Sequence, residues 1–151
     1  MELAVLAEEL GAGSLWVSHH VIHTGFVAER LGRGNYYDPF ISLAAAAVVT
    51  SRVRLGTSVL VLGYLNPFVT AKQLATLDWL SRGRVDVGVG VGALHAEFAA
   101  TNVVDYGRRG DYADEFIAVM KLLWSGGKQT HPGEFFPFEE VEAYPGSKGP
   151  G

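Results

Sequence analysis

The segment that most restricts the fold of this chain is Val53–Leu62, which is apolar at nearly every position. A strand that is apolar on both faces belongs to a sheet covered on both sides, and such sheets are usually parallel. Parallel neighbours require long crossover connections, which are most often helices. The segment therefore predicts an α/β chain in which helices and strands alternate.

The segments on either side of this strand carry the same helix-start signal. Asp38-Pro39 precedes the strand and Asn66-Pro67 follows it. Aspartate and asparagine are good N-caps, and proline fits the first helical turn because its missing N–H is not needed there. We predict one helix from Pro39 to about Val49 and a second from Pro67 to Gly83.

Apolar periodicity and glycines at helix ends predict the remaining elements. They are a helix ending at Gly11, a strand at Ser14–Ser18, a strand within Arg84–Ala93, a helix at Arg109–Trp124 and a short hairpin within 133–146. This order is typical of an α/β fold with parallel strands. Three strands are too few to close a barrel or to form a typical open sheet, so we expect part of a larger fold.

Composition excludes several classes of protein. The chain has 151 residues, 48% apolar and 19% charged, which suits one globular domain. A net charge of −4 without a basic cluster argues against nucleic acid, and no apolar run reaches the roughly 20 residues of a membrane span. The acidic N-terminus does not resemble a signal peptide. The absence of cysteine suits a reducing compartment, so we expect a cytoplasmic protein.

Two adjacent histidines, His19 and His20, follow the strand Ser14–Ser18. Side chains alternate along a strand, so the two rings cannot share one face. An imidazole exchanges protons near neutral pH, and parallel α/β folds build their sites at the carboxyl ends of strands. Either ring could therefore face a ligand, or be hydrogen-bonded into the loop.

A metal site is not predicted. His23 lies close to the pair, but His-His-x-x-His lacks the i, i+4 spacing of a helical zinc site, and no carboxylate is near in the sequence.

Three glycines, Gly88, Gly90 and Gly92, lie at alternate positions and hence on one face of their strand. A face without side chains indicates the close approach of a bulky group, or tight packing against a helix. The stretch also matches a G-x-G-x-x-A dinucleotide pattern. That match is weak, because the acidic residue expected about 20 positions further on falls within a helix, near Asp111.

Polar residues in two other segments need partners. Thr57 and Ser58 carry the only hydroxyls in their apolar strand, and either a neighbouring backbone or the edge of a bound ring could satisfy them. Arg108 and Arg109 begin a helix, where the macrodipole disfavours cations. We expect an ion pair with Asp111 or Glu115 rather than a ligand there.

The chain resembles the luciferase-like monooxygenase family in five segments that agree in order and spacing. They are residues 7–20, 37–92, 94–98, 107–124 and 131–138. Its members are flavin- or deazaflavin-dependent (β/α)8 barrels. The sequence of these segments is most similar to the branch that uses coenzyme F-420. The resemblance implies an oxidoreductase that moves a hydride between F-420 and a small organic substrate. The alternatives are an FMN-dependent monooxygenase that activates dioxygen, and a non-catalytic barrel fragment or assembly module.

The resemblance covers strands two to four of the barrel with their helices and an insertion hairpin. Residues 1–151 would then be a single partial (β/α)8 domain, lacking the first strand and strands five to eight. Such a piece exposes sheet edges, which predicts a homo-oligomer or association through those edges. We expect the isolated chain to be inactive.

The resemblance also implies roles for particular residues. His20 matches the histidine common to the family and would exchange a proton with the substrate. His19, beside the ring, replaces the aspartate usual in deazaflavin users and matches the His-His pair of bacterial luciferases. The segment Thr57-Ser58-Val59 would back the ring through a non-prolyl cis peptide at Ser58-Val59.

The next strand end is implied to pass the same ring at Gly90, Gly92 and Ala93. The sugar-phosphate dehydrogenase branch of the family has a catalytic acid at the position of Ala93. Its absence argues against a sugar-phosphate substrate.

Overall fold

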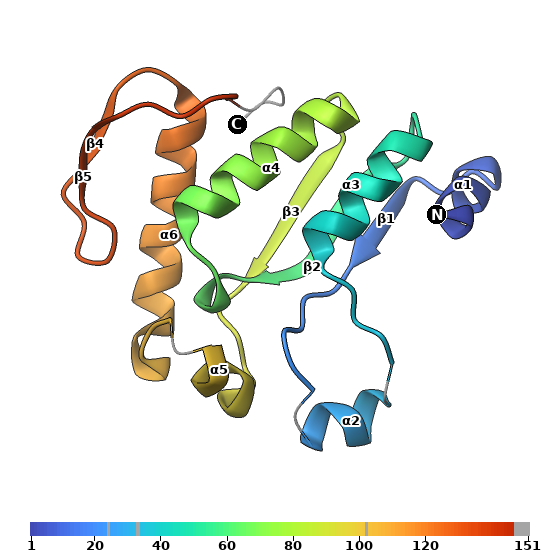
Figure 1. Ribbon diagram of the computed structural model, residues 1–151, viewed down its shortest axis with the longest axis horizontal. Helices are drawn as coiled ribbons and strands as arrows, with labels where there is room; N and C mark the ends of the chain where they lie inside the picture. Colours follow the sequence, from blue (N-terminus) through green and yellow to red (C-terminus); the bar gives the residue numbers. More distant parts are fainter. Residues whose placement is uncertain (24, 33, 102, 147–151) are drawn as a thin grey trace.

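The structure is a computed structural model that describes residues 1–23, 25–32, 34–101 and 103–146. Helices separate its first three strands along the chain (Figure 1). Its helices and strands are α1 (Glu2–Glu9), β1 (Ser14–Val17), α2 (Gly25–Leu31), α3 (Pro39–Val49), β2 (Arg54–Val61), η1 (Leu62–Tyr64), α4 (Pro67–Ser81), β3 (Val85–Gly90), α5 (His95–Thr101), η2 (Tyr106–Arg108), α6 (Arg109–Ser125), β4 (Gln129–His131) and β5 (Phe138–Val141).

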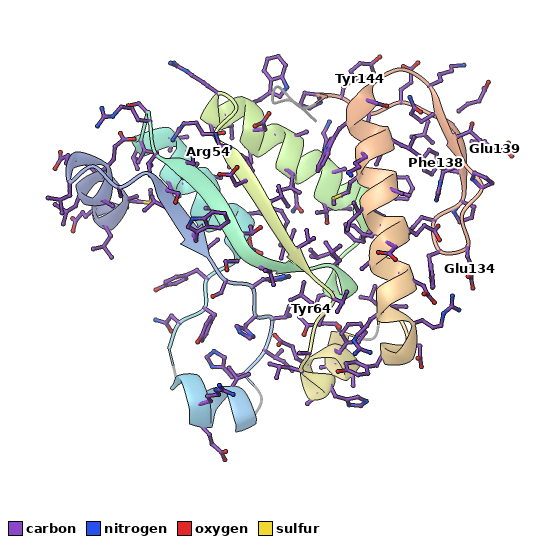
Figure 2. The ribbon with its side chains drawn as sticks, turned by 180° about the vertical axis from the view of Figure 1, so that it is seen from behind. Arg54, Tyr64, Glu134, Phe138, Glu139 and Tyr144 are labelled. Atoms are coloured by element: carbon purple, nitrogen blue, oxygen red, sulfur yellow. The ribbon has the colours of Figure 1, made fainter. Side chains whose placement is uncertain are left out.

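The first three strands form a parallel sheet in the order β1-β2-β3, which confirms the predicted α/β fold. Helices α3 and α4 lie across one face of this sheet. They are in front of the strands in Figure 1 and behind them in Figure 2, which is seen from the opposite side. The carboxyl ends of the strands therefore meet at one edge, towards α5 and the loop that contains α2.

Both predicted helix starts are confirmed, because the cap side chains satisfy free backbone N–H groups. The Asp38 carboxylate accepts from Ile41 N at 2.9 Å, and the Asn66 amide oxygen accepts from Phe68 N at 3.0 Å. Helix α4 ends as predicted at a left-handed turn, with Gly83 at φ 83°.

Two clusters of buried side chains join the helices to the sheet. In one, Leu55 of β2 packs among Leu43, Ala46 and Ala47 of α3. The other joins α4 and α6, and every residue of the apolar α6 stripe is buried in it. The members of that stripe are Tyr112, Phe116, Val119, Met120 and Leu123.

Three expectations about local structure were wrong or incomplete. The short helices α2 and α5 lie in segments for which no helix was predicted. The hairpin pairs β4 with β5, so its first strand lies before residue 133 and residues 133–137 belong to the turn. The strand predicted within Arg84–Ala93 is β3, which ends at Gly90 and is only partly buried: Val87 and Val89 are 36% and 37% exposed, and β3 is an edge of the described sheet.

Helix α1 turns its apolar residues outward. Leu3, Leu6 and Leu10 are 80%, 48% and 79% exposed, and only Ala4 packs against the α3 cluster. None of the described helices is long and apolar enough to cross a bilayer.

The carboxylate of Glu8 fastens α1 to the start of β2. It accepts hydrogen bonds from the backbone N–H groups of Ser51, Arg52 and Val53 at 2.6–3.0 Å. These donors, that of Val53 first, lower the pKa of Glu8 from 4.5 to about 2. The bonds are made by the ionised form of the side chain.

The free energy of unfolding should therefore depend on pH through Glu8. A folded pKa below the unfolded one gives a contribution that is present above about pH 4.5 and is lost as the pH falls towards 2. Glu8→Gln should lower stability at neutral pH and flatten this acid limb. Urea unfolding over a pH series measures both effects. Glu9→Gln, a change in an exposed neighbour, is the control, and an acid limb equally steep in Glu8→Gln would contradict the prediction.

Candidate active site

A cleft of about 520 Å³ opens at the carboxyl ends of β1, β2 and β3. The loop after β1, the second half of β2, the loop after β3 and the starts of α5 and α6 each contribute to its wall. Its lining residues are Ser18, His19, His20, Ser58, Val59, Val61, Tyr64, Val91, Gly92, Ala93, Leu94, Glu97, Tyr106 and Arg109. Of the eight residues to which the resemblance gave a catalytic or cofactor-binding role, six line this cleft: His19, His20, Ser58, Val59, Gly92 and Ala93.

His19 ties the end of β1 to the end of β2. Its side chain is buried, and its Nδ1 accepts a hydrogen bond from Val61 N at 3.2 Å. Burial lowers the pKa of the His19 imidazole, which favours the neutral ring. The ring also packs edge-on against Tyr64, with 5.7 Å between the ring centroids. His19 is therefore held as a neutral acceptor for a backbone N–H.

His20 contacts a carboxylate. Its Nδ1 lies 3.2 Å from Oε2 of Glu97, and its ring packs edge-on against Tyr36 at 4.9 Å. The pair is formed by residues 77 positions apart in the sequence. The two adjacent histidines thus have different hydrogen-bond partners, although both line the cleft. Strand alternation does not separate them, because β1 ends at Val17, before either residue.

Glu97 of α5 is a candidate functional residue that was not predicted from the sequence. Its side chain is 1% exposed, and it contacts the loop after β1 as well as Tyr64. Burial and then the Glu97 charge raise the pKa of the Tyr64 hydroxyl. Tyr64 lies beside the lower end of the sheet in Figure 2. The available signal was an acidic residue in the motif Leu94–Phe98, shortly after a strand end that was already a candidate.

A bulge in β2 forms the back of the cleft. Thr57 pairs with Val87 and Leu60 with Val89, so Ser58 and Val59 together lie opposite Gly88. The peptide bond between Ser58 and Val59 is cis, as the resemblance implied.

The glycine row of β3 makes room for this bulge. A Cβ at Gly88 would overlap the carbonyl oxygen of Thr57, and one at Gly90 would lie 2.8 Å from Cγ2 of Val59. The close neighbour of Gly88 and Gly90 is the adjoining strand β2. It is neither a bound bulky group nor a helix, which were the two interpretations of the glycine row. The row is not the start of a helix, so the dinucleotide pattern has no structural counterpart here.

Two of the candidate cofactor residues, Thr57 and Gly90, lie behind the cleft and do not line it. Thr57 is 1% exposed, and its hydroxyl donates to Gly88 O at 2.8 Å. Gly90 faces Val59. The structure thus favours the backbone-bonded alternative for the Thr57 hydroxyl, while Ser58 remains exposed at the cleft.

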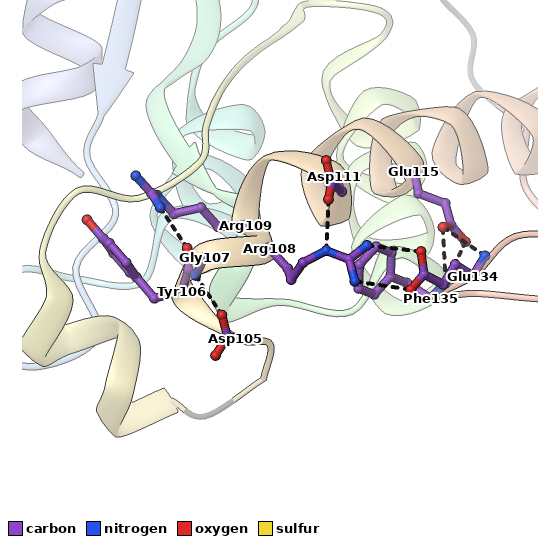
Figure 3. Close-up of polar contacts among 9 residues, drawn as sticks. All are labelled: Asp105, Tyr106, Gly107, Arg108, Arg109, Asp111, Glu115, Glu134 and Phe135. Carbon is purple, nitrogen blue, oxygen red and sulfur yellow. Dashed lines mark hydrogen bonds and ion pairs between the residues drawn. The ribbon is translucent and has the colours of Figure 1, made fainter.

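The two arginines at the start of α6 have different surroundings (Figure 3). Arg108 pairs with Asp111 at 2.8 Å, as predicted, and also with Glu134 at 2.9 Å in the hairpin turn. Arg109 departs from the prediction: its guanidinium lies 3.9 Å from the centre of the Tyr106 ring, where it lines the cleft. Its Nε is buried and has no hydrogen-bond partner among the described residues.

A second cavity of about 400 Å³ adjoins the first and shares His20 with it. Its other walls come from the loop residues 21–23 and 34–37, including His23 and Tyr36. Within the described ranges, no group of three or more histidine, cysteine, aspartate or glutamate side chains could hold a metal ion.

The fold and this cleft are those of α/β proteins that build their sites at the carboxyl ends of parallel strands. The family model described as luciferase-like monooxygenase matches residues 1–150, and the chain belongs to that family. The family is one of flavin- or F-420-dependent oxidoreductases, as its named members show.

Three relatives illustrate the range of the family. The chain is 36% identical to the F420-dependent glucose-6-phosphate dehydrogenase of Kineococcus radiotolerans over 95% of this chain and 42% of that protein. It is 30% identical to the oxygenase component of the flavin-dependent trigonelline monooxygenase of Acinetobacter baylyi, over 96% and 38%. The crystal structure of monooxygenase RslO1 from Streptomyces bottropensis superposes with a TM-score of 0.86 at 34% identity, over 97% and 42%. The chain therefore spans about two fifths of the length of these relatives.

Proposed function

We propose that this chain contributes the ring-binding wall of an oxidoreductase that moves a hydride between coenzyme F-420 and a small organic substrate. The observation that carries the proposal is the contact of His20 with the buried Glu97 at the edge of the cleft. A histidine held by a carboxylate beside a cleft is suited to exchanging a proton with a bound molecule.

The residues present fit a flat, largely apolar ring. Val59, Val61 and Ala93 supply apolar walls, and the small Gly92 and Ala93 leave the strand end open. The buried, unpartnered Nε of Arg109 is a donor available to a polar group of the same ligand. We propose that His19, Ser58, Val59, Gly92 and Ala93 hold the ring through their side chains or backbone.

When bound, the deazaflavin supplies the acceptance and donation of the hydride. The residues of this chain would orient it and handle the proton. His20 would give a proton to the substrate or take one from it. His19 stays neutral and keeps the ends of β1 and β2 together, because its Nδ1 is engaged by Val61 N.

An FMN-dependent monooxygenase is the second candidate. Two observations favour it: the His19-His20 pair, where deazaflavin users usually have aspartate first, and the 30% identity to a flavin-dependent monooxygenase component. In that case the same cleft would hold the isoalloxazine ring, and reduced FMN would support turnover.

We further propose that β1, β2 and β3 are strands two to four of a (β/α)8 barrel and that residues 1–151 act as one partial domain. The likeness to RslO1 supports this arrangement. The exposed side chains at the edges, Trp16 of β1 and Val87 of β3, favour association of the chain through those edges. The remaining alternative is a fragment or assembly module without catalysis of its own.

Titration of the purified protein with F-420 and with FMN, with size exclusion to report its oligomeric state, tests the proposal. We expect F-420 to bind more tightly than FMN. Ala93→Trp should weaken that binding by about tenfold or more, because an indole there would fill part of the cleft. Ala118→Trp, on the exposed side of α6, is the matched control.

Each other outcome assigns a different function. Tighter binding of FMN would favour the monooxygenase, and binding of neither cofactor would favour the fragment. Equal effects of the two tryptophan substitutions would show that the ring does not occupy this cleft.

A further inference from the structure

We infer that Glu97 is a positioning residue that fixes His20 in the tautomer protonated at Nδ1 and leaves Nε2 as the nitrogen that exchanges a proton. The catalytic part of this inference rests on the proposed function. The tautomer itself rests only on contacts among the described residues.

The first step is the fixed orientation of the Glu97 carboxylate. Its Oε1 accepts hydrogen bonds from Val21 N at 2.6 Å and from Ile22 N at 3.4 Å. Both donors are backbone amides of the loop that carries His20. A backbone N–H can only donate, so Oε1 can only accept.

The second step concerns Oε2, which contacts the Tyr64 hydroxyl at 3.3 Å and His20 Nδ1 at 3.2 Å. With both carboxylate oxygens occupied as acceptors, an unprotonated Nδ1 would set its lone pair against Oε2. A hydrogen on Nδ1 makes the contact attractive, and it is charge-assisted. The carboxylate therefore selects the Nδ1–H form of the ring.

The third step is the place of His20 between two cavities. The ring lines both the 520 Å³ cleft and the 400 Å³ cavity, and Tyr36 packs edge-on against it at 4.9 Å. Glu97 and Tyr36 together restrict rotation of the ring. The proton at Nδ1 is committed to Glu97, so Nε2 is the nitrogen that can accept a proton from a bound substrate or return it.

The neighbouring ring provides an internal comparison. His19 Nδ1 accepts from Val61 N, so the single proton of neutral His19 must be on Nε2. Two consecutive histidines are thus expected to hold opposite tautomers. A requirement that acted on the whole loop would give both rings the same tautomer. Opposite tautomers point to the individual partners of each ring.

Long-range 1H–15N correlation spectra of the histidine-labelled chain test the inference without any cofactor. The signals are assigned from the His19→Gln and His20→Gln spectra. We expect neutral His20 to show protonated Nδ1 and neutral His19 to show protonated Nε2. In Glu97→Gln, the side-chain oxygen should take the place of Oε1 and its NH2 group should face His20. The His20 nitrogen signals should then interchange, while those of His19 stay unchanged.

Glu115→Gln is the matched control, because it makes the same charge change 3.3 Å from another imidazole, His131. It should alter the signals of His131 and leave His20 as it is. Tyr64→Phe removes the hydroxyl that contacts Oε2 but leaves Oε2 itself as the acceptor for His20. His20 should therefore keep its Nδ1 proton.

Two results would overturn the inference: neutral His20 protonated at Nε2 in the unsubstituted chain, or unchanged His20 signals in a folded Glu97→Gln chain. If Glu97→Gln does not fold, the unsubstituted chain and Tyr64→Phe still decide the tautomer. A chain that binds neither F-420 nor FMN would contradict the proposed function and leave the tautomer result intact.

Discussion

Replacing Phe116 with alanine should lower the free energy of unfolding by about 3–5 kcal/mol, because it leaves a cavity in the main core. The ring is fully buried, and it packs against Tyr112 and Phe136 with centroids 6.0 Å apart in each case. This cluster joins α6 to α4 and to the hairpin, so no single element can move to fill the space. Urea or guanidinium unfolding measures the loss.

Phe135→Ala provides the comparison for this prediction. The same ring is removed, but Phe135 is only half-buried and packs under Arg108 at 4.9 Å. We expect it to cost about 1–2 kcal/mol, since less apolar area leaves water on folding. Equal losses for the two variants would mean that the cluster around Phe116 is not the main source of stability.

Gly88→Ala should separate β2 from β3 at the bulge and damage the cleft at the same time. A Cβ at Gly88 overlaps a backbone atom, the Thr57 carbonyl oxygen, and no side-chain rotation can relieve that overlap. We expect a loss of about 1–3 kcal/mol in the free energy of unfolding. The shift should also displace Ser58 and Val59, which line the cleft, so cofactor binding should weaken even where the chain remains folded.

Gly110→Ala is the matched glycine control. Gly110 lies in α6, and a Cβ built there meets nothing within 4 Å. The substitution should be neutral or should stabilise the chain by about 0.4–1 kcal/mol, because alanine loses less backbone entropy on folding. If Gly88→Ala behaved like Gly110→Ala, the packing of the bulge against the glycine row would be loose. The glycines of β3 would then need another explanation.

Local signals predicted most of the framework. Asp38-Pro39 and Asn66-Pro67 mark helix starts because the cap and the proline act on the next few backbone groups alone. The α6 stripe predicted its buried face for a similar reason, since helical periodicity is a short-range property. The exposed stripe of α1 shows the limit of this reasoning. Leu3, Leu6 and Leu10 have the spacing of a buried face, but burial depends on what lies opposite.

The candidate site was predicted in part. The end of the first strand placed His19 and His20 at the correct edge of the sheet. The resemblance implied the cis conformation of the Ser58-Val59 peptide bond. Thr57 and Gly90 were chosen from the same segments, but the alternation of strand faces and the register shift turn them away from the cleft. A bulge changes register by one residue, and no feature of β2 alone announces it.

By itself the sequence determined the alternation of helices and strands, the parallel sheet and the edge at which a site could form. These follow from periodicity, caps and glycines, each of which acts over a few residues. Only the tertiary structure decided which histidine has a carboxylate. Glu97 meets His20 across 77 positions of the chain because the loop after β1 and helix α5 both lie at the carboxyl edge of the sheet. No carboxylate lies near the two histidines in the sequence, yet that of Glu97 lies 3.2 Å from His20 in space, because parallel strands bring their carboxyl ends to one edge whatever their separation along the chain.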